Sequence, residues 1–102
     1  MDFHEKHENV LPRNVLDEII RFSKTYGINR VTLFGSRARG TNRERSDVDI
    51  FVSGKDVDGF RAALEDEAET LLRFDVIDAR GKVSGELKAE IERDGVVIYE
   101  EI

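Results

Sequence analysis

Apolar residues recur along this chain with two different spacings, which predict its helices and strands. Spacing by three and four positions predicts amphipathic helices over residues 12–26, about 58–72 and 85–93. Short apolar runs predict strands over residues 30–34, 47–53, 74–78 and 96–99. A short helix over residues 36–39, closed by Gly40, is expected between the first two strands. The order predicts a single α/β (α+β) domain with a mixed four-stranded sheet and flanking helices.

The spacing also predicts which helical side chains face the core. In the helix over residues 58–72 we expect this inner face to consist of Phe60, Leu64, Ala68 and Leu71.

Length and composition are those of one small globular domain. The chain has 102 residues, 39% apolar and 37% charged, and no cysteine. We take residues 11–102 as the domain and residues 1–10 as a flexible lead-in, in which His4 and His7 lack a third metal ligand. The chain has no apolar run long enough to span a bilayer and no signal peptide, so we expect a cytoplasmic protein without a membrane partner.

The distribution of charge bears on the ligand. A net charge of −6 argues against direct binding to nucleic acid. Five arginines nevertheless gather near the first two strands, namely Arg30, Arg37, Arg39, Arg43 and Arg45. For any single one, pairing with a nearby acid on a solvated loop is the simpler interpretation. As a group they suggest a compact anionic ligand such as a triphosphate.

Two aspartates lie close together at the start of the second strand. Strand alternation places Asp47 and Asp49 on one face together with Phe51. Neighbouring carboxylates repel each other unless a cation lies between them. A hard divalent ion such as Mg2+ takes oxygen ligands and leaves room for phosphate oxygens. The pair is therefore a candidate metal site.

The turn before the aspartates is suited to phosphate. Gly35 allows close approach of a backbone, Ser36 offers a hydroxyl, and a helix that starts here directs free N–H groups at an anion. A metal site next to a phosphate site is the arrangement of phosphoryl- or nucleotidyl-transfer enzymes.

The third strand offers one more carboxylate, from Asp75 or Asp78. Alternation puts these two on opposite faces, so only one can point at Asp47 and Asp49, and parity alone does not say which. We favour Asp75, because an acid at the start of a buried strand is costly to hide unless it is paired or metal-bound. Asp78 suits a turn at the end of the strand.

These motifs together resemble a known family. The sequence Gly-Ser-Arg-Ala-Arg-Gly, the Ser-Asp-x-Asp that ends at Asp49 and the strand Phe-Asp-Val-Ile-Asp are similar, in order and spacing, to the signature of minimal nucleotidyltransferases (MNT) of the DNA polymerase β-like superfamily. The resemblance covers nearly the whole chain. It implies an Mg2+-dependent enzyme with ATP as co-substrate, in which a hydroxyl attacks the α-phosphate and pyrophosphate leaves.

The resemblance also implies a role for each matching residue. Asp47, Asp49 and Asp75 would be the catalytic, metal-binding carboxylates, with Asp75 helping to activate the attacking hydroxyl. Gly35 and Ser36 would hold the triphosphate. Of the two arginines in the loop, Arg39 is the first candidate to reach its oxygens, and Arg37 the second.

Chains of this size resemble the antitoxin half of HEPN–MNT toxin–antitoxin pairs, whose family activity is transfer of AMP to a tyrosine of the all-helical HEPN partner. We adopt this protein adenylyltransferase as the leading hypothesis. The acceptor site would be completed by the partner or by a second copy in a homo-oligomer. The alternatives are a non-catalytic module that neutralises or scaffolds a helical partner by contact, and an enzyme that modifies an antibiotic-like small molecule.

Overall fold

The computed structural model of the protein describes residues 11–101. Its elements are α2 (Arg13–Thr25), β1 (Ile28–Phe34), α3 (Gly35–Arg39), β2 (Val48–Gly54), α4 (Val57–Asp66), β3 (Phe74–Asp78), α5 (Gly85–Asp94) and β4 (Val96–Glu100). Each expected helix and strand is present, and the small α+β fold with a mixed four-stranded sheet is confirmed. The predicted lead-in with His4 and His7 lies outside the described residues.

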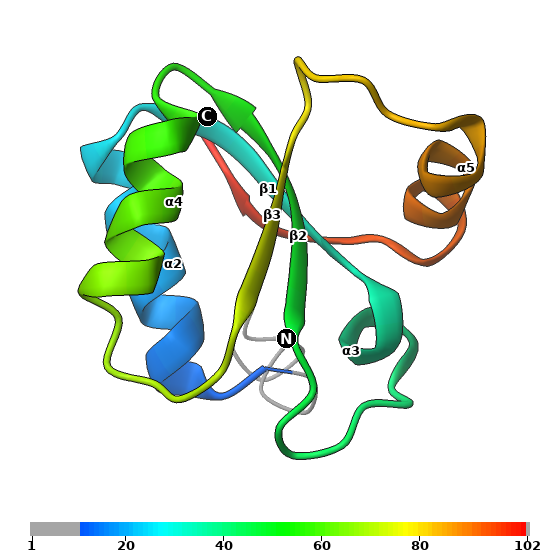
Figure 1. Ribbon diagram of the computed structural model, residues 1–102, viewed down its shortest axis with the longest axis horizontal. Coiled ribbons are helices and arrows are strands. Elements are labelled where there is room, and N and C mark those ends of the chain that lie inside the picture. The colour runs from blue at the N-terminus through cyan, green and yellow to red at the C-terminus, as the bar shows by residue number, and fades with distance from the viewer. Residues whose placement is uncertain (1–10, 102) are drawn as a thin grey trace.

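The sheet has the strand order β3-β2-β1-β4. Strand β1 is antiparallel to both of its neighbours, and β2 is parallel to β3, with α4 as the crossover between them. Helices α2 and α4 cover one side of the sheet, while α3 and α5 lie on the other (Figure 1). One face of the sheet is therefore fully used for packing, and the other is available for a site.

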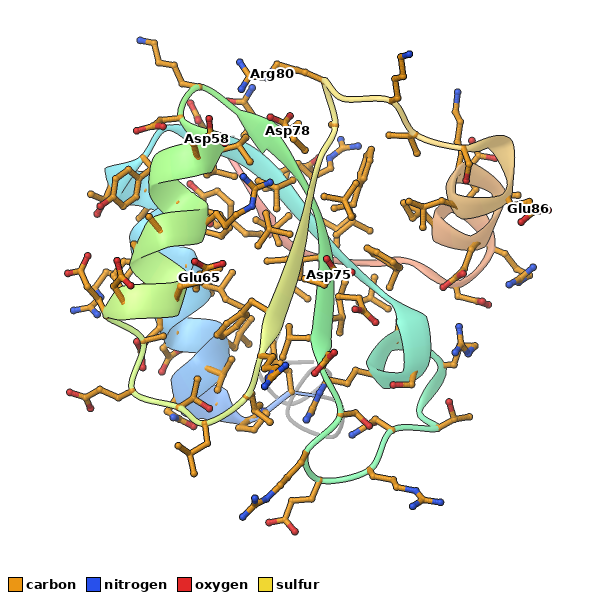
Figure 2. All side chains as sticks on the ribbon, viewed as in Figure 1. Asp58, Glu65, Asp75, Asp78, Arg80 and Glu86 are labelled. Atoms are coloured by element: carbon orange, nitrogen blue, oxygen red, sulfur yellow. The ribbon has the colours of Figure 1, made fainter. Side chains whose placement is uncertain are left out.

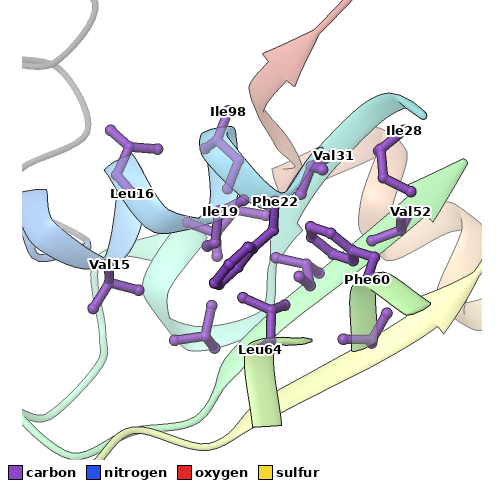
Figure 3. Packing of buried hydrophobic residues seen from close by; sticks show 14 of the residues in the cluster. Val15, Leu16, Ile19, Phe22, Ile28, Val31, Val52, Phe60, Leu64 and Ile98 are labelled. Carbon is purple, nitrogen blue, oxygen red and sulfur yellow. The ribbon is translucent and has the colours of Figure 1, made fainter. Parts of the chain in front are cut away.

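The hydrophobic core fills the space between the sheet and the helices α2 and α4 (Figure 3). The helices contribute a stripe of buried side chains, namely Val15, Leu16, Ile19, Phe22, Phe60 and Leu64. From β2 the fully buried side chains are Val48, Ile50 and Val52. Each such side chain stabilises the fold by about 1.5–3 kcal/mol relative to exposure. The same alternation turns the intervening residues of β2, Asp49 and Phe51, toward α3 and α5.

Helix α4 is shorter than expected, because it ends at Asp66. The prediction that Leu71 faces the core is wrong: Leu71 is 91% exposed, whereas Ala68 still packs against the core. Acidic residues crowd the end of the helix and its last turn has no basic residue, which is unfavourable beside the negative end of the helix dipole. The N–H of Glu69 donates instead to the carboxylate of Glu18 in α2, at 3.0 and 3.1 Å.

Helix α5 rests on the other side of the sheet with little burial. Its N-terminus is capped by Ser84, whose hydroxyl accepts a hydrogen bond of 3.1 Å from the N–H of Leu87. Leu87 and Ile91 are half-buried, and no residue within Gly85–Asp94 is fully buried. Among residues 11–101, no helix is both long enough and apolar enough to cross a bilayer.

Candidate active site

The centre of the site is the contact between the end of β1 and the start of β2. Phe34 pairs with Asp49 in the register of these strands, and the chain then turns directly into α3. Gly35, the first residue of that turn, has a φ of +75°, and a Cβ placed on it would overlap Oδ2 of Asp49 and lie 3.1 Å from its Cγ. Glycine is therefore required at this position for two reasons: the backbone has a positive φ, and the carboxylate occupies the space of a Cβ.

The third carboxylate is placed by the register between β2 and β3. Asp75 pairs with Asp49, so the two side chains leave the same face of the sheet from neighbouring strands. Asp78 pairs with Val52 and belongs to the opposite face; its carboxylate accepts hydrogen bonds from the backbone N–H and guanidinium of Arg80, at 2.9 and 3.2 Å (Figure 2). The structure thus brings Asp75, and not Asp78, beside Asp49.

The burial on which the choice of Asp75 rested is not observed. Asp75 is exposed, because β3 is an edge strand and its outer face carries no helix there. It is the second residue of β3, and its label in Figure 2 lies beside the neighbouring strand β2. An exposed carboxylate at a sheet edge is within reach of a group that arrives from solvent.

Like charges converge on Asp49. Partial burial raises the pKa of the Asp49 carboxyl above its ordinary value, and the neighbouring charges of Asp75, Asp47 and Glu90 raise this pKa further. The guanidinium of Arg39 acts in the opposite direction. The charges of both Asp47 and Asp75, the carboxylates grouped with Asp49 from the sequence, thus contribute to the raised pKa of Asp49.

The donor set fits a hard divalent cation. Carboxylate oxygens are the ligands that Mg2+ prefers, and a cation would relieve the repulsion that raises the pKa of Asp49. Within residues 11–101, no three carboxylate or imidazole side chains already stand close enough to hold an ion. Because Asp47 and Asp75 are exposed, their side chains are free to turn toward Asp49.

The two arginines of α3 have different surroundings. Arg37 is only 2% exposed, and its guanidinium donates hydrogen bonds of 3.0 Å to the carbonyls of Ser46 and Glu44. Burial lowers the pKa of Arg37, and its contacts fasten the loop that leads into Asp47. Its role as a nucleotide ligand stays a prediction.

Arg39 is exposed and donates to the carboxylate of Glu90 in α5 at 3.3 Å. Arg30, in contrast, does not join the other arginines. It forms an ion pair with Glu100 of β4, near the start of β1 and thus at the end of this strand that is farther from α3. The basic cluster inferred from sequence therefore does not converge as a whole, and Arg39 is the member whose charge acts on Asp49.

Glu90 is the residue that sequence reasoning missed. It lies in a helix with several acids, and no spacing in the sequence distinguishes it from Glu86 or Glu92. Only the packing of α5 beside α3 brings its charge to Arg39 and Asp49.

Comparison with known proteins identifies the family. The model of the polymerase beta nucleotidyltransferase domain matches residues 17–101, which is most of the chain. No curated protein matches the sequence.

Solved structures share the fold. A crystal structure of a toxin–antitoxin with AMP-PNP is 22% identical and has a TM-score of 0.66, with 84% of this chain and 73% of that chain covered. A substituted form of the toxin–antitoxin MntA-HpeT is 20% identical with a TM-score of 0.65, over the same shares of the two chains. A structure described as a minimal nucleotidyltransferase is 27% identical with a TM-score of 0.64 and covers 94% of this chain and 95% of its own.

Proposed function

The chain belongs to the polymerase beta nucleotidyltransferase family, and we propose that it transfers AMP from ATP to a tyrosine hydroxyl of an all-helical HEPN-domain toxin and so acts as its antitoxin. One observation carries the proposal: Asp49 lies between the backbone of Gly35 and the register-matched Asp75. The similar toxin–antitoxin structures, one of them with an ATP analogue, support the choice of partner and nucleotide.

The nucleotide is held at the junction of β1, α3 and β2. Gly35 and Ser36 receive the phosphates, and Arg39, once released from Glu90, donates to their oxygens. Asp47, Asp49 and Asp75 would hold Mg2+, which would offset the charge of the triphosphate and polarise the α-phosphate. Arg37 contributes indirectly, by fixing the loop from which Asp47 projects.

The transfer is an in-line displacement at the α-phosphate. The tyrosine oxygen forms a bond to phosphorus as the bond to the bridging oxygen of pyrophosphate breaks, and pyrophosphate leaves with that electron pair. The phenolic proton passes to the carboxylate of Asp75, which is exposed and lies at the sheet edge. Because β3 is the edge strand, a tyrosine on another chain can reach this carboxylate without displacing any element.

In the direct test, the purified protein is incubated with the proposed HEPN-domain partner, ATP and Mg2+, and the mass of the partner is measured. We expect an added AMP on a tyrosine. Asp49→Asn should abolish the addition, whereas Asp78→Asn, which changes the same type of residue on the opposite face, should retain it.

A second readout separates catalysis from simple contact. The double variant Asp47→Ala/Asp49→Ala is tested for binding to the partner and for neutralisation of its toxicity. Loss of neutralisation with intact complex formation is the expected result. Full neutralisation by this variant would contradict the proposal and favour the non-catalytic binding module.

A further inference from the structure

A hollow of about 440 Å³ lies between α5 and the sheet, on the same side as the carboxylates. The residues that line it are Phe51, Ala79, Gly81, Val83, Lys88, Ile91 and Glu92. Its sides are thus mainly apolar, with an aromatic ring from β2 and one basic and one acidic side chain from α5. Its volume is in the range of sites for small ligands, about 300–1,000 Å³.

The position of the hollow relative to Asp49 follows from strand geometry. Phe51 and Asp49 are alternate residues of β2 and share a face, and their register partners in β3 are Ile77 and Asp75. Two residues of a strand span about 7 Å. This spacing leaves room for a sugar ring between the ring of Phe51 and the carboxylates that would surround the α-phosphate.

The remaining parts of the site determine which group of the substrate reaches the hollow. Helix α3 follows β1, so the phosphates held at Gly35 lie on the β1 side of Asp49, whereas Asp75 lies on the β3 side. An in-line displacement needs the leaving group and the acceptor on opposite sides of phosphorus. Pyrophosphate and acceptor are thus arranged across the strands. The hollow lies farther along β2, away from the line that joins pyrophosphate and acceptor. This is the direction left for the nucleoside, the third group attached to the α-phosphate.

We infer that this hollow binds the nucleoside of the donor nucleotide, with its base stacked on Phe51. Every base has an apolar aromatic face, and stacking on an aromatic side chain is a general way to bind one. Lys88 supplies a donor and Glu92 an acceptor for polar edges of the base or sugar. The inference rests on the proposed transfer and adds to it the site of the base.

The test compares ATP with inorganic tripolyphosphate, which has the phosphates and no nucleoside. Both dissociation constants are measured by calorimetry with Mg2+ for the wild type, Phe51→Leu and Phe74→Leu. Phe74 is the matched control: it is half-buried on β3, but it packs on the core side, opposite Val48 in the register. Leucine keeps an apolar side chain at both positions, and thermal melting verifies that both variants are folded.

We expect Phe51→Leu to weaken ATP roughly tenfold, the scale of one lost stacking contact, and to leave tripolyphosphate unchanged. Phe74→Leu should leave both constants unchanged. Unaltered ATP affinity in Phe51→Leu, or equal weakening of both ligands, would overturn the inference. Unaltered ATP affinity with a raised KM for the acceptor would assign the hollow to the acceptor instead. Absence of any ATP binding by the wild type would be recognised separately, as failure of the proposed function itself.

Discussion

The carboxylate of Asp49 lies directly against the backbone of Gly35 and occupies the space where any other residue at position 35 would place its Cβ. This contact joins the turn that we propose binds phosphate to the strand that we propose binds the metal. It exists because Phe34 and Asp49 are paired in the register of β1 and β2, and because Gly35 takes a positive φ as the chain leaves β1. The position of the carboxylate therefore depends on the absence of a side chain one strand away.

Gly35→Ala is predicted to abolish Mg2+-dependent ATP binding and to lower Tm. Alanine at a φ of +75° is strained by about 1–2 kcal/mol, and its methyl group also displaces Asp49. Gly40→Ala is the matched control, since Gly40 has a φ of +76° but no atom within 4 Å of its added Cβ. Thermal melting and calorimetry of both variants check this. Equal loss of ATP binding in the two would show that strain, and not the contact with Asp49, is responsible.

Asp49→Asn is predicted to raise Tm at pH 7, although it removes a group that we propose is essential for transfer. The pKa of Asp49 is raised in the folded state, so its ionised form destabilises the fold, and this penalty is fully present above the folded pKa. As the pH falls through that pKa the wild type takes up a proton and the difference in Tm disappears. Stabilisation by loss of an active-site charge is a common trade-off between stability and activity.

Asp78→Asn should show the opposite sign in the same series of melts. Hydrogen bonds from Arg80 hold the pKa of Asp78 below its ordinary value, so this carboxylate stabilises the fold above the unfolded value of 3.8. The variant is expected to lower Tm at pH 7, and the loss should vanish as the pH falls through the folded pKa. Shifts of the same sign for the two variants would contradict the electrostatics described for the site.

The strands and the faces of their residues could be predicted because both depend on local pattern. Apolar runs located all the strands, and alternation alone put Asp49 and Phe51 on one side. Asp47, predicted as the first residue of this strand, lies directly before β2, which starts at Val48. The choice between Asp75 and Asp78 could not be derived in this way. It depends on the register in which β3 pairs with β2 after the α4 crossover. The local sequence pattern does not determine this register, and the structure shows it.

Long-range packing explains the other differences. Arg37 and Arg39 are two positions apart in a short helix, and the fold of residues 41–47 decides that one is buried under the loop and the other exposed. The role of Glu90 depends on where α5 rests beside α3. The early end of α4 had a local cause, the acids of its last turn, but apolar spacing outweighed this signal in the prediction.

Substitution of the two arginines of α3 is predicted to affect different properties, the stability of the fold for Arg37 and phosphate binding for Arg39. Arg37→Ala leaves the carbonyls of Ser46 and Glu44 without their guanidinium donors and should destabilise the fold by about 2 kcal/mol. Arg39→Ala should hardly change Tm, because exposed ion pairs contribute at most about 1 kcal/mol. It should, however, weaken tripolyphosphate binding roughly tenfold, as expected for the loss of a charged hydrogen bond. Urea denaturation and calorimetry measure the two effects, and unchanged tripolyphosphate binding in Arg39→Ala would exclude its phosphate contact.

Glu90→Gln is predicted to increase the affinity for ATP in the absence of Mg2+. Glu90 accepts a hydrogen bond from Arg39 and adds its negative charge to those around Asp49, so a triphosphate must compete with it for the guanidinium. Glutamine keeps the shape and removes the charge. The expected gain is about fivefold, the equivalent of a half-exposed ion pair of about 1 kcal/mol. With Mg2+ the gain should be smaller, because the cation already offsets the acidic charges.

The control for this prediction is Glu86→Gln, which removes the same charge from the same helix. Glu86 lies on the outer side of α5, away from the sheet (Figure 2). Calorimetric titrations of ATP into both variants, each with and without Mg2+, separate a local effect from a change in net charge. Equal gains in the two variants would mean that overall charge is responsible, and a weaker affinity in Glu90→Gln would mean that Glu90 orients Arg39 for the phosphates instead of competing with them.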